Sequence, residues 1–265
     1  MLLSELKTII FHRRLLLALT RREILGQVKG SILGIYWSLL EPLMLLAIYT
    51  VVFHFVLKIR MGAEGGPYSF SLYLFCGLLP FLAISRALNR SSTVIMENRN
   101  LIKKLIFPSE ILPLNMVLSA LVSQFFGFVI LILGVVILNG RIGWTVLLLP
   151  LLLLPQILLT AGLAWLVASL GVFIRDTRQA VSLLMVAWMF LTPIFYDESY
   201  VARIFPAGLY LNPLADLLAG YRAILIRGQL PDWTRVGIVY LIGGVLCLFG
   251  LWWFSRSKKA FIDVI

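Results

Sequence analysis

Six long apolar stretches dominate the chain, and each is long enough to cross a lipid bilayer as an α-helix. Of the 265 residues, 61% are hydrophobic and 13% are charged, whereas ordinary soluble domains have about 45–50% and about 25%. This balance excludes a soluble enzyme, a disordered chain and a disulfide scaffold. Because the runs are continuous rather than alternating, an outer-membrane β-barrel is excluded as well. We therefore predict an all-α polytopic membrane protein with six transmembrane helices, at about residues 34–57, 70–88, 112–138, 145–173, 179–195 and 236–254.

The segments outside these stretches divide the chain into three parts. Residues 1–33 mix apolar side chains with paired arginines, which predicts an amphipathic helix in the cytoplasmic membrane interface. Residues 34–254 form the predicted transmembrane domain, and residues 255–265 form a cytoplasmic tail. Between the fifth and sixth spans, residues 196–235 are semi-polar and include Arg222. There we expect short interfacial or re-entrant helices instead of a seventh span.

Basic residues gather on one side of the predicted spans. The chain has 23 Lys and Arg against 12 Asp and Glu, a net charge of +11. Membrane proteins concentrate Lys and Arg in cytoplasmic loops, which explains the excess without a nucleic-acid partner. The segments before the first span and after the second, fourth and sixth are richer in basic residues than the alternate loops. We therefore predict that both termini are cytoplasmic, together with Lys7, Arg13, Arg14, Arg21, Arg22, Lys29, Arg86, Arg90, Arg99, Lys103, Lys104, Arg175, Arg178, Arg256, Lys258 and Lys259.

The sequence indicates neither coupling to an ion gradient nor ATP binding by this chain. Charges at mid-depth usually mark ion pathways, and the predicted spans nearly lack them. Glu41 lies near the cytoplasmic end of the first span, and His54 lies near its opposite end. A phosphate-binding G-x-x-x-x-G-K-[ST] loop does not occur, so another polypeptide would supply ATP hydrolysis. The two histidines and two cysteines show no metal-ligand spacing, and we predict no metal or cofactor on this chain.

Two arginine pairs mark the N-terminal segment, Arg13–Arg14 and Arg21–Arg22, and Lys29 follows them at the entry to the first span. One interpretation is a membrane anchor with its arginines at headgroup depth. The other is that these residues receive a phosphate-bearing lipid substrate, since a planar guanidinium can hold two phosphate oxygens at once. The hypotheses differ in whether Lys can replace Arg.

Aromatic side chains lie in the first and fifth spans. Rings at span ends usually form interfacial belts, and deeper rings usually pack in the core. Flat rings can also stack on sugar faces without fixing one register, which suits a translocating polymer. We predict that a sugar path is lined by Tyr49, Phe53, Trp188 and Phe195, with core packing as the alternative.

Three local patterns together carry a resemblance to a known family. The first is KGSILGIYWSLLEP at residues 29–42, and the second is NLIKKLIFPSEILP at residues 100–113. The third is Arg175-Asp176 after the fourth span, with TPIFY at residues 192–196 and Asn212-Pro213 beyond it. The chain, over about residues 8–258, resembles ABC-2 type permeases of the polysaccharide-export branch, which includes O-antigen, capsule and teichoic-acid exporters. The first two patterns are fairly specific in combination, whereas Arg-Asp alone is weak.

The resemblance implies a transport function with defined partners. It implies a homodimer of this permease in the bacterial inner membrane, with two separate ATP-binding subunits that carry ATP and Mg²⁺. It also implies a polysaccharide substrate, such as O-antigen, on an undecaprenyl diphosphate carrier. The second pattern matches the family's coupling region, a short cytoplasmic helix that docks in a groove of the ATPase; a solvated loop is the alternative. The coupling residues are expected to be Glu97, Arg99, Asn100, Leu101, Ile102, Lys103, Lys104 and Leu105.

Three other functions have to be weighed against polysaccharide export. The first is an ABC-2 permease for a small lipid or drug. The second is an intramembrane acyl- or glycosyltransferase, which would need His, Asp or Glu clustered at one membrane depth; Glu41, His54 and Asp216 lie in unrelated segments. The third is a passive channel without an ATPase. We expect a permease subunit and not an enzyme.

Overall fold

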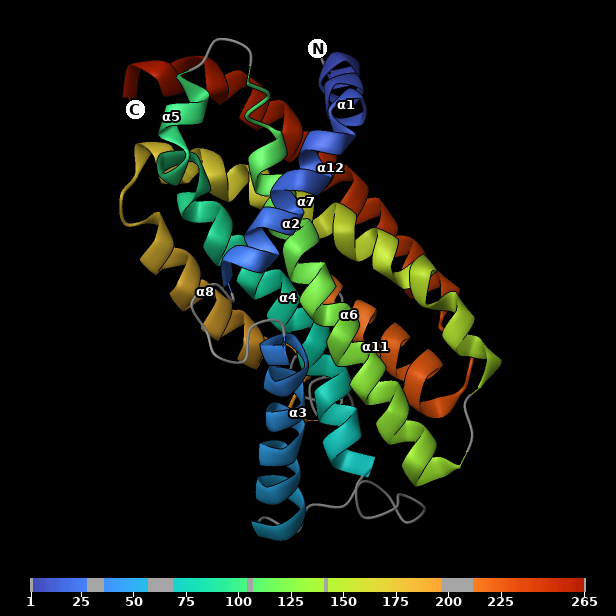
Figure 1. Ribbon diagram of the computed structural model, residues 1–265. Helices are drawn as coiled ribbons and strands as arrows, with labels where there is room; N and C mark the ends of the chain where they lie inside the picture. Colours follow the sequence, from blue (N-terminus) through green and yellow to red (C-terminus); the bar gives the residue numbers. More distant parts are fainter. Residues whose placement is uncertain are drawn as a thin grey trace.

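The computed structural model describes residues 2–27, 36–56, 69–103, 107–140, 143–196 and 212–264, and all regular structure in these ranges is helical (Figure 1). The predicted all-α fold class is thus confirmed. The elements are α1 (Leu2–Phe11), α2 (Arg13–Gln27), α3 (Trp37–Tyr49), the π-helix η2 (Thr50–Val56), α4 (Ser69–Glu97), α5 (Arg99–Ile102), α6 (Ile111–Asn139), the 3₁₀-helix η3 (Trp144–Leu148), α7 (Leu149–Phe173), α8 (Thr177–Leu191), α11 (Pro213–Arg222), the π-helix η4 (Ala223–Arg227) and α12 (Trp233–Val264).

Four helices in the described ranges are long and apolar enough to cross a membrane. They run over Phe70–Glu97, Ile111–Leu138, Trp144–Phe173 and Trp233–Phe261, at the predicted second, third, fourth and sixth spans. The predicted first and fifth spans are shorter apolar helices. The fifth ends at Leu191 because the backbone turns extended at Thr192, directly before Pro193. Both ends of the chain lie at one end of the bundle, which we call the terminal end (Figure 1).

Two helices continue beyond the predicted apolar stretches. α4 runs to Glu97, so Arg86 and Arg90 lie on a helix and not in a loop. α12 runs to Val264, so most of the predicted tail is helical. Its last turns hold because Phe254 and Phe261, both buried, contact each other with ring centroids 5.4 Å apart. Phe261 also contacts Phe173 at the end of α7, 5.9 Å away.

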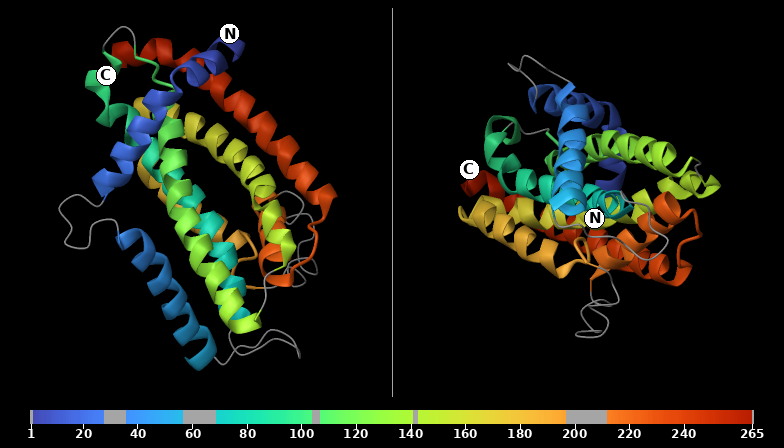
Figure 2. Two further views of the ribbon diagram at one scale, coloured as in Figure 1. Left: turned by 45° about the vertical axis from the view of Figure 1, so that its right-hand side comes forward. Right: turned by 90° about the horizontal axis from the view of Figure 1, so that it is seen from below.

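The N-terminal segment is helical, as predicted, but it is divided into two helices near His12. α1 contacts α12, and α2 lies across α6 (Figure 2). On α2, Leu16 and Thr20 are buried one turn apart, while the two predicted arginine pairs are exposed. α2 thus buries one edge against the bundle and exposes its arginines together with apolar side chains such as Leu17 and Leu25.

α4 lies at the centre of the bundle, with α6 and α7 packed against it, and 83% of its most apolar window is buried. α7 and α12 run side by side (Figure 2). A Cβ atom on Gly162 would overlap the backbone at Leu246, and one on Gly250 would overlap the Gly162 carbonyl. Small residues that allow such close backbone approach are the usual means by which membrane helices associate.

A buried polar network links α6, α7 and α11. The amides of Gln124 and Gln156 donate to each other over 3.0 and 2.7 Å, and the Tyr221 hydroxyl donates to Gln156 Oε1 over 2.6 Å. All three side chains are at most 3% exposed. Hydrogen bonds of this kind hold helices together where apolar burial is shared with lipid.

The segment before α12 forms a short helix, as predicted, but Arg222 at its end is a core residue, only 1% exposed. Its guanidinium donates to the carbonyls of Pro193 and Ile194 over 2.7 and 3.2 Å and to the Tyr73 hydroxyl over 2.9 Å. It also lies 3.6 Å from the centroid of the Tyr73 ring. The sequence did not predict the burial of this charge, which follows because α11 packs against α4.

The close contact between α7 and α12 predicts a selective sensitivity to added methyl groups. We expect Gly250→Ala to destabilise the protein by about 1–3 kcal/mol, because the new Cβ forces the two backbones apart. Gly244→Ala on the same helix is the matched control, since nothing lies within 4 Å of its Cβ, and helix propensity alone favours Ala there. Thermal unfolding of the two purified variants in detergent distinguishes them. Equal melting temperatures would contradict this packing.

Candidate functional site

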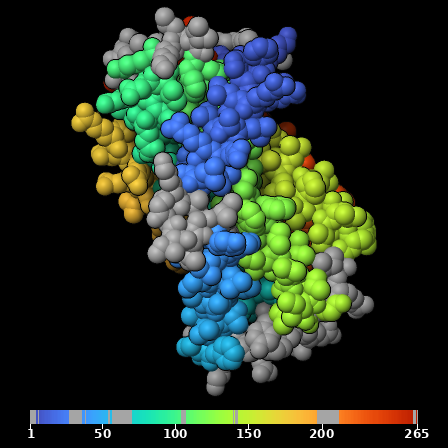
Figure 3. Space-filling view, in the orientation of Figure 1, coloured from blue at the N-terminus to red at the C-terminus, as the bar shows by residue number. Residues whose placement is uncertain are grey.

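The largest hollow in the described structure is a groove of about 1400 Å³ between α2, α3, α4 and α6. α2 and α3 lie on one face of the molecule, with α2 nearer the terminal end (Figure 3). α2 contributes Arg21, Arg22 and Glu23, α3 contributes Trp37 and Glu41, α4 contributes Arg86, Arg90 and Glu97, and α6 contributes Leu112, Asn115, Met116 and Ser123. The groove thus combines charged walls with a mixed polar and apolar floor.

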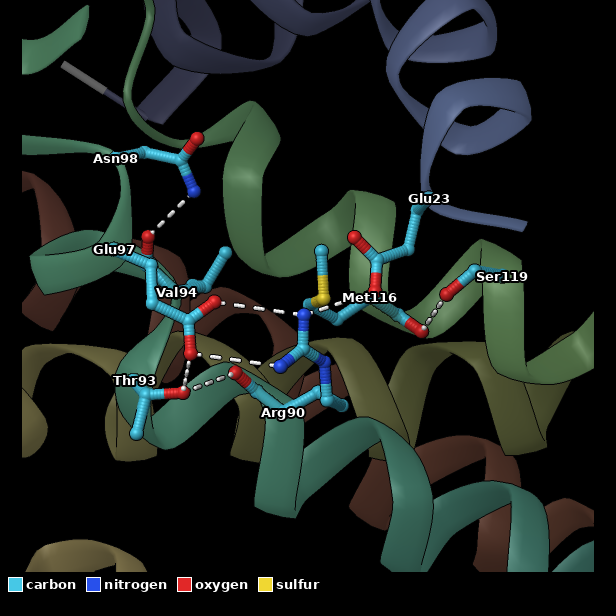
Figure 4. A network of polar contacts seen from close by, with 8 residues as sticks. All are labelled: Glu23, Arg90, Thr93, Val94, Glu97, Asn98, Met116 and Ser119. Carbon is cyan, nitrogen blue, oxygen red and sulfur yellow. Dashed lines mark hydrogen bonds and ion pairs between the residues drawn. The ribbon is translucent and has the colours of Figure 1, made fainter. Parts of the chain in front are cut away.

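Arg90 connects two walls of the groove (Figure 4). Its Nη2 lies 3.0 Å from Glu23 Oε1 on α2 and 3.5 Å from Glu97 Oε2 at the end of α4. The Thr93 hydroxyl donates to Glu97 Oε1 over 2.7 Å, which fixes that carboxylate one turn away. The charge of Arg90 is therefore balanced by two carboxylates, and its side chain remains 42% exposed.

A second ion pair crosses the groove between α3 and α4. Arg86 Nη2 lies 2.7 Å from Glu41 Oε1. Their side chains are 31% and 51% exposed, so water screens the pair and its contribution to stability is small, about 0–1 kcal/mol. Contacts of this strength can be exchanged for contacts with a ligand at little cost.

Arg21 and Arg22 are the cations in the groove that remain available. Both are exposed and line the groove, and neither has a carboxylate within ion-pair distance in the described parts of the chain. Adjacent guanidinium forks suit a ligand with several anionic oxygens, since each can donate two parallel hydrogen bonds. The groove can therefore hold an anionic headgroup beside apolar and polar side chains.

The structure divides the predicted phosphate-entry residues. Arg21 and Arg22 line the groove, whereas Arg13 and Arg14, two turns earlier on α2, are exposed outside it. Lys29 lies outside the described residues. The structure thus places only the second pair in the groove, and the role of each pair stays a prediction.

The predicted sugar-path residues form two separate groups. Tyr49 and Phe53 lie on α3 and η2 with ring centroids 6.1 Å apart. Trp188 on α8 donates to Asn212 Oδ1 over 3.0 Å, and Phe195 stacks on Phe190 at 5.9 Å. All four predicted residues pack partly buried against the hydrophobic core, and none lines the groove. The structure does not bring them into one site, so the sugar path stays a prediction.

The predicted coupling residues are also divided by the structure. On α5, Arg99 and Asn100 are exposed, as is Lys103 directly after it, and Leu101 is half-buried. Ile102 is only 9% exposed and packs in a core cluster with Trp165 and Phe254. Ile102 therefore does not belong to an exposed apolar ridge, while Lys104 and Leu105 lie outside the described residues. Glu97 faces the groove and binds Arg90.

Sequence reasoning missed Arg90, Glu23 and Asn115 as groove residues. Arg86 and Arg90 were assigned to a loop because hydropathy falls after Leu88, although the spacing of four between them fits one helix face. Asn115, Ser119 and Ser123 repeat every fourth residue within an otherwise apolar span. That polar stripe was the available signal for α6.

A charged contact outside the groove ties α1 to the bundle. Lys258 Nζ lies 2.8 Å from Glu5 Oε1 and 3.5 Å from Glu110 Oε2. Burial raises the pKa of Glu110, and a hydrogen bond with Glu5 raises it further. Burial opposes the charge on Glu5 too, but hydrogen bonds with Glu110 and Lys258 lower the pKa of Glu5 overall. The two carboxyl groups thus lie beside one ammonium group, with the pKa of Glu110 raised and that of Glu5 lowered.

Comparison with known proteins places the chain in a family. Residues 14–226 match the ABC-2 type transporter family, and the chain belongs to it. The protein is accordingly a multi-pass membrane permease, the non-catalytic transmembrane subunit of an ABC transporter, as the resemblance in the sequence indicated.

Individual relatives cover almost the whole chain. It is 30% identical over 260 residues to the O-antigen export system permease protein RfbA of Myxococcus xanthus, which covers 96% of both chains. It is 26% identical over 255 residues to the RfbA protein of Klebsiella pneumoniae, which covers 95% of both. It is 23% identical over 248 residues to the polysialic acid transport protein KpsM of Escherichia coli, which covers 92% of this chain and 94% of KpsM.

The opposite pKa shifts of Glu5 and Glu110 predict a pH-dependent docking of α1. Because the pKa of Glu110 is raised, this residue contributes fully to stability at pH values below 4.5, the ordinary pKa of the group. That contribution is lost as the pH rises through the folded-state pKa. Because the pKa of Glu5 is lowered, this residue contributes fully to stability at pH values above 4.5. That contribution is lost as the pH falls through the folded-state pKa. Docking of α1 should therefore be strongest at pH values between the lowered pKa of Glu5 and the raised pKa of Glu110.

Hydrogen exchange of the α1 amides, corrected for intrinsic rates, measures this docking across pH. Glu110→Gln keeps a neutral hydrogen-bond donor near Glu5, so we expect it to abolish the loss of protection on the alkaline side. If the α1 amides of Glu110→Gln still lose protection as the pH rises, the attribution of this loss to Glu110 is contradicted.

Proposed function

We propose that the chain is the permease subunit of an ATP-driven exporter that moves a lipid-linked polysaccharide, such as O-antigen on undecaprenyl diphosphate, across the bacterial inner membrane. The observation that carries this proposal is the groove, with two available arginines beside polar and apolar walls at the terminal end of the bundle. The relatives named for O-antigen and polysialic acid transport support a polysaccharide substrate.

Size and charge of the groove favour a large anionic amphiphile. Pockets for drug-sized ligands enclose about 300–1,000 Å³, and this groove has about 1400 Å³ within a single copy of the chain. Arg21 and Arg22 would hold the diphosphate, and Leu112 and Met116 would contact its lipid portion. A small lipid or drug would leave much of this space unfilled.

The proposed assembly contains two copies of this permease and two ATP-binding subunits, with six crossings and cytoplasmic termini in each copy. Basic side chains at the terminal end, including Arg99, Lys103, Arg256 and Lys259, support a cytoplasmic location of that end. The exposed face of α5 and Lys103 would contact the ATPase. ATP and Mg²⁺ would be held by those partner subunits.

The structure offers a physical route from the ATPase contact to the groove. α5 follows α4 directly, and Glu97 at the end of α4 contacts Arg90, which in turn contacts Glu23 on α2. A displacement of α5 would therefore change the ion pairs that join α4 to α2. We propose that this exchange alters access to Arg21 and Arg22 during the transport cycle.

The two arginine pairs on α2 permit a matched test of substrate binding. Arg21→Lys/Arg22→Lys should reduce export at least about tenfold, because an ammonium group cannot reproduce the bidentate contact, and about 1.4 kcal/mol of binding corresponds to that factor. Arg13→Lys/Arg14→Lys makes the same change outside the groove and should retain export. Surface polysaccharide in a strain dependent on this permease provides the measurement. Full export by the first variant, or equal loss in both, would contradict the proposed site.

The exposed face around α5 permits a separate test of coupling. Arg99→Glu/Lys103→Glu should weaken association with the ATP-binding subunit and abolish substrate-stimulated hydrolysis, while the permease still inserts and folds. Arg256→Glu/Lys259→Glu introduces the same charge change on α12 and serves as the control. Co-purification and ATPase activity of the reconstituted complex give the readouts. Ile102 is left unchanged because its burial confounds any effect. Normal hydrolysis in the α5 variant would place the ATPase contact elsewhere.

A further inference from the structure

One buried polar atom in the wall of the groove has no partner among the residues that the structure describes. Asn115 is 4% exposed and lines the groove from α6, and its Oδ1 makes no hydrogen bond in the described structure. A buried amide oxygen without a partner is costly, and the cost is removed when a donor arrives. Asn115 lines the groove, so a rotation of its side chain would bring this acceptor to a ligand bound there.

Asn115 begins a polar stripe that follows α6 away from the terminal end. Ser119 and Ser123 follow at intervals of four residues, so the three side chains lie on one helix face over about 12 Å. Ser119 is buried, and its hydroxyl donates to the Met116 carbonyl over 3.0 Å (Figure 4). Ser123 lines the groove and also a small hollow of about 30 Å³ that reaches Gln124. Polar contacts thus continue from the groove into the bundle.

We propose that this stripe is a subsite that binds hydroxyl groups of the first sugar attached to the lipid diphosphate. Asn115 Oδ1 accepts a hydrogen bond from one of these hydroxyls. The inference rests on the proposed function, since Arg21 and Arg22 must hold the diphosphate for the attached group to lie near α6. α2 crosses α6 in direct contact, so an anion held by α2 places its neighbouring group over that floor. The arginines provide affinity for the carrier, and Asn115 provides selectivity for a carrier that bears sugar.

Binding of two probes to the full-length permease in nanodiscs tests this subsite. The probes are farnesyl diphosphate and farnesyl diphosphate linked to one N-acetylglucosamine. We expect wild-type protein to prefer the sugar-bearing probe by about tenfold, which corresponds to about 1.4 kcal/mol. Asn115→Leu, which is similar in size but has no acceptor, should bind both probes equally. Asn115→Asp keeps an acceptor at the same position and should retain the preference.

Asn89→Leu is the matched control, because Asn89 lies on α4 outside the groove and donates to the Ser85 carbonyl over 2.9 Å. It should keep the tenfold preference. A wild-type protein that binds both probes equally, or an Asn115→Leu variant that keeps the preference, would overturn the subsite while leaving the proposed function intact. Failure of wild-type protein to bind either probe would overturn the proposed function and the subsite together.

A lipid headgroup hydroxyl is the competing source of the same chemistry. The measurement is therefore made in nanodiscs of phosphatidylcholine and in nanodiscs containing phosphatidylglycerol, whose glycerol carries hydroxyls next to a phosphate. A preference for the sugar probe in both lipids supports the subsite as a sugar reader. Loss of the preference in phosphatidylglycerol alone would assign Asn115 to a resident lipid and overturn the proposal.

Discussion

Close backbone contact between α7 and α12 is the interaction on which the bundle depends. In a membrane, apolar side chains gain little by leaving lipid for a neighbouring helix, so helices are held by backbone proximity and by polar contacts. Gly162 and Gly250 supply the first, and Gln124, Gln156 and Tyr221 supply the second. With α4 buried between α6 and α7, these contacts define a rigid frame against which the remaining helices lie.

The groove lies where this frame meets more loosely held elements. α3 exposes large apolar side chains such as Leu43 and Ile48, and α2 and α3 are joined to α4 by partly exposed ion pairs. Exposed ion pairs contribute little to stability, so their rearrangement costs little. The ion pairs that join α2 and α3 to α4 can therefore be exchanged for other contacts more easily than the contacts inside the frame.

The sequence predicted what depends on local composition and missed what depends on contact. Spans were found because about 20 apolar residues are a local property, but α4 continues through Arg86 and Arg90 because its polar turns pair with α2 and α3. α12 continues because Phe261 meets Phe173 from a distant helix. In the groove, the paired arginines at 21–22 were visible as a motif. Asn115 belongs to a polar stripe that is visible in the sequence, but only packing reveals that its Oδ1 has no partner among the described residues.

Arg222 has a consequence for how the helices assemble. Its guanidinium stays charged at any physiological pH and cannot be left in lipid without partners. Its partners in the described structure include Tyr73 on α4 and the two carbonyls that follow α8. α11 can make these contacts only where α4 and the end of α8 are already present. The cost of burying this charge is therefore offset by groups from two other helices, which replace the water that the guanidinium loses.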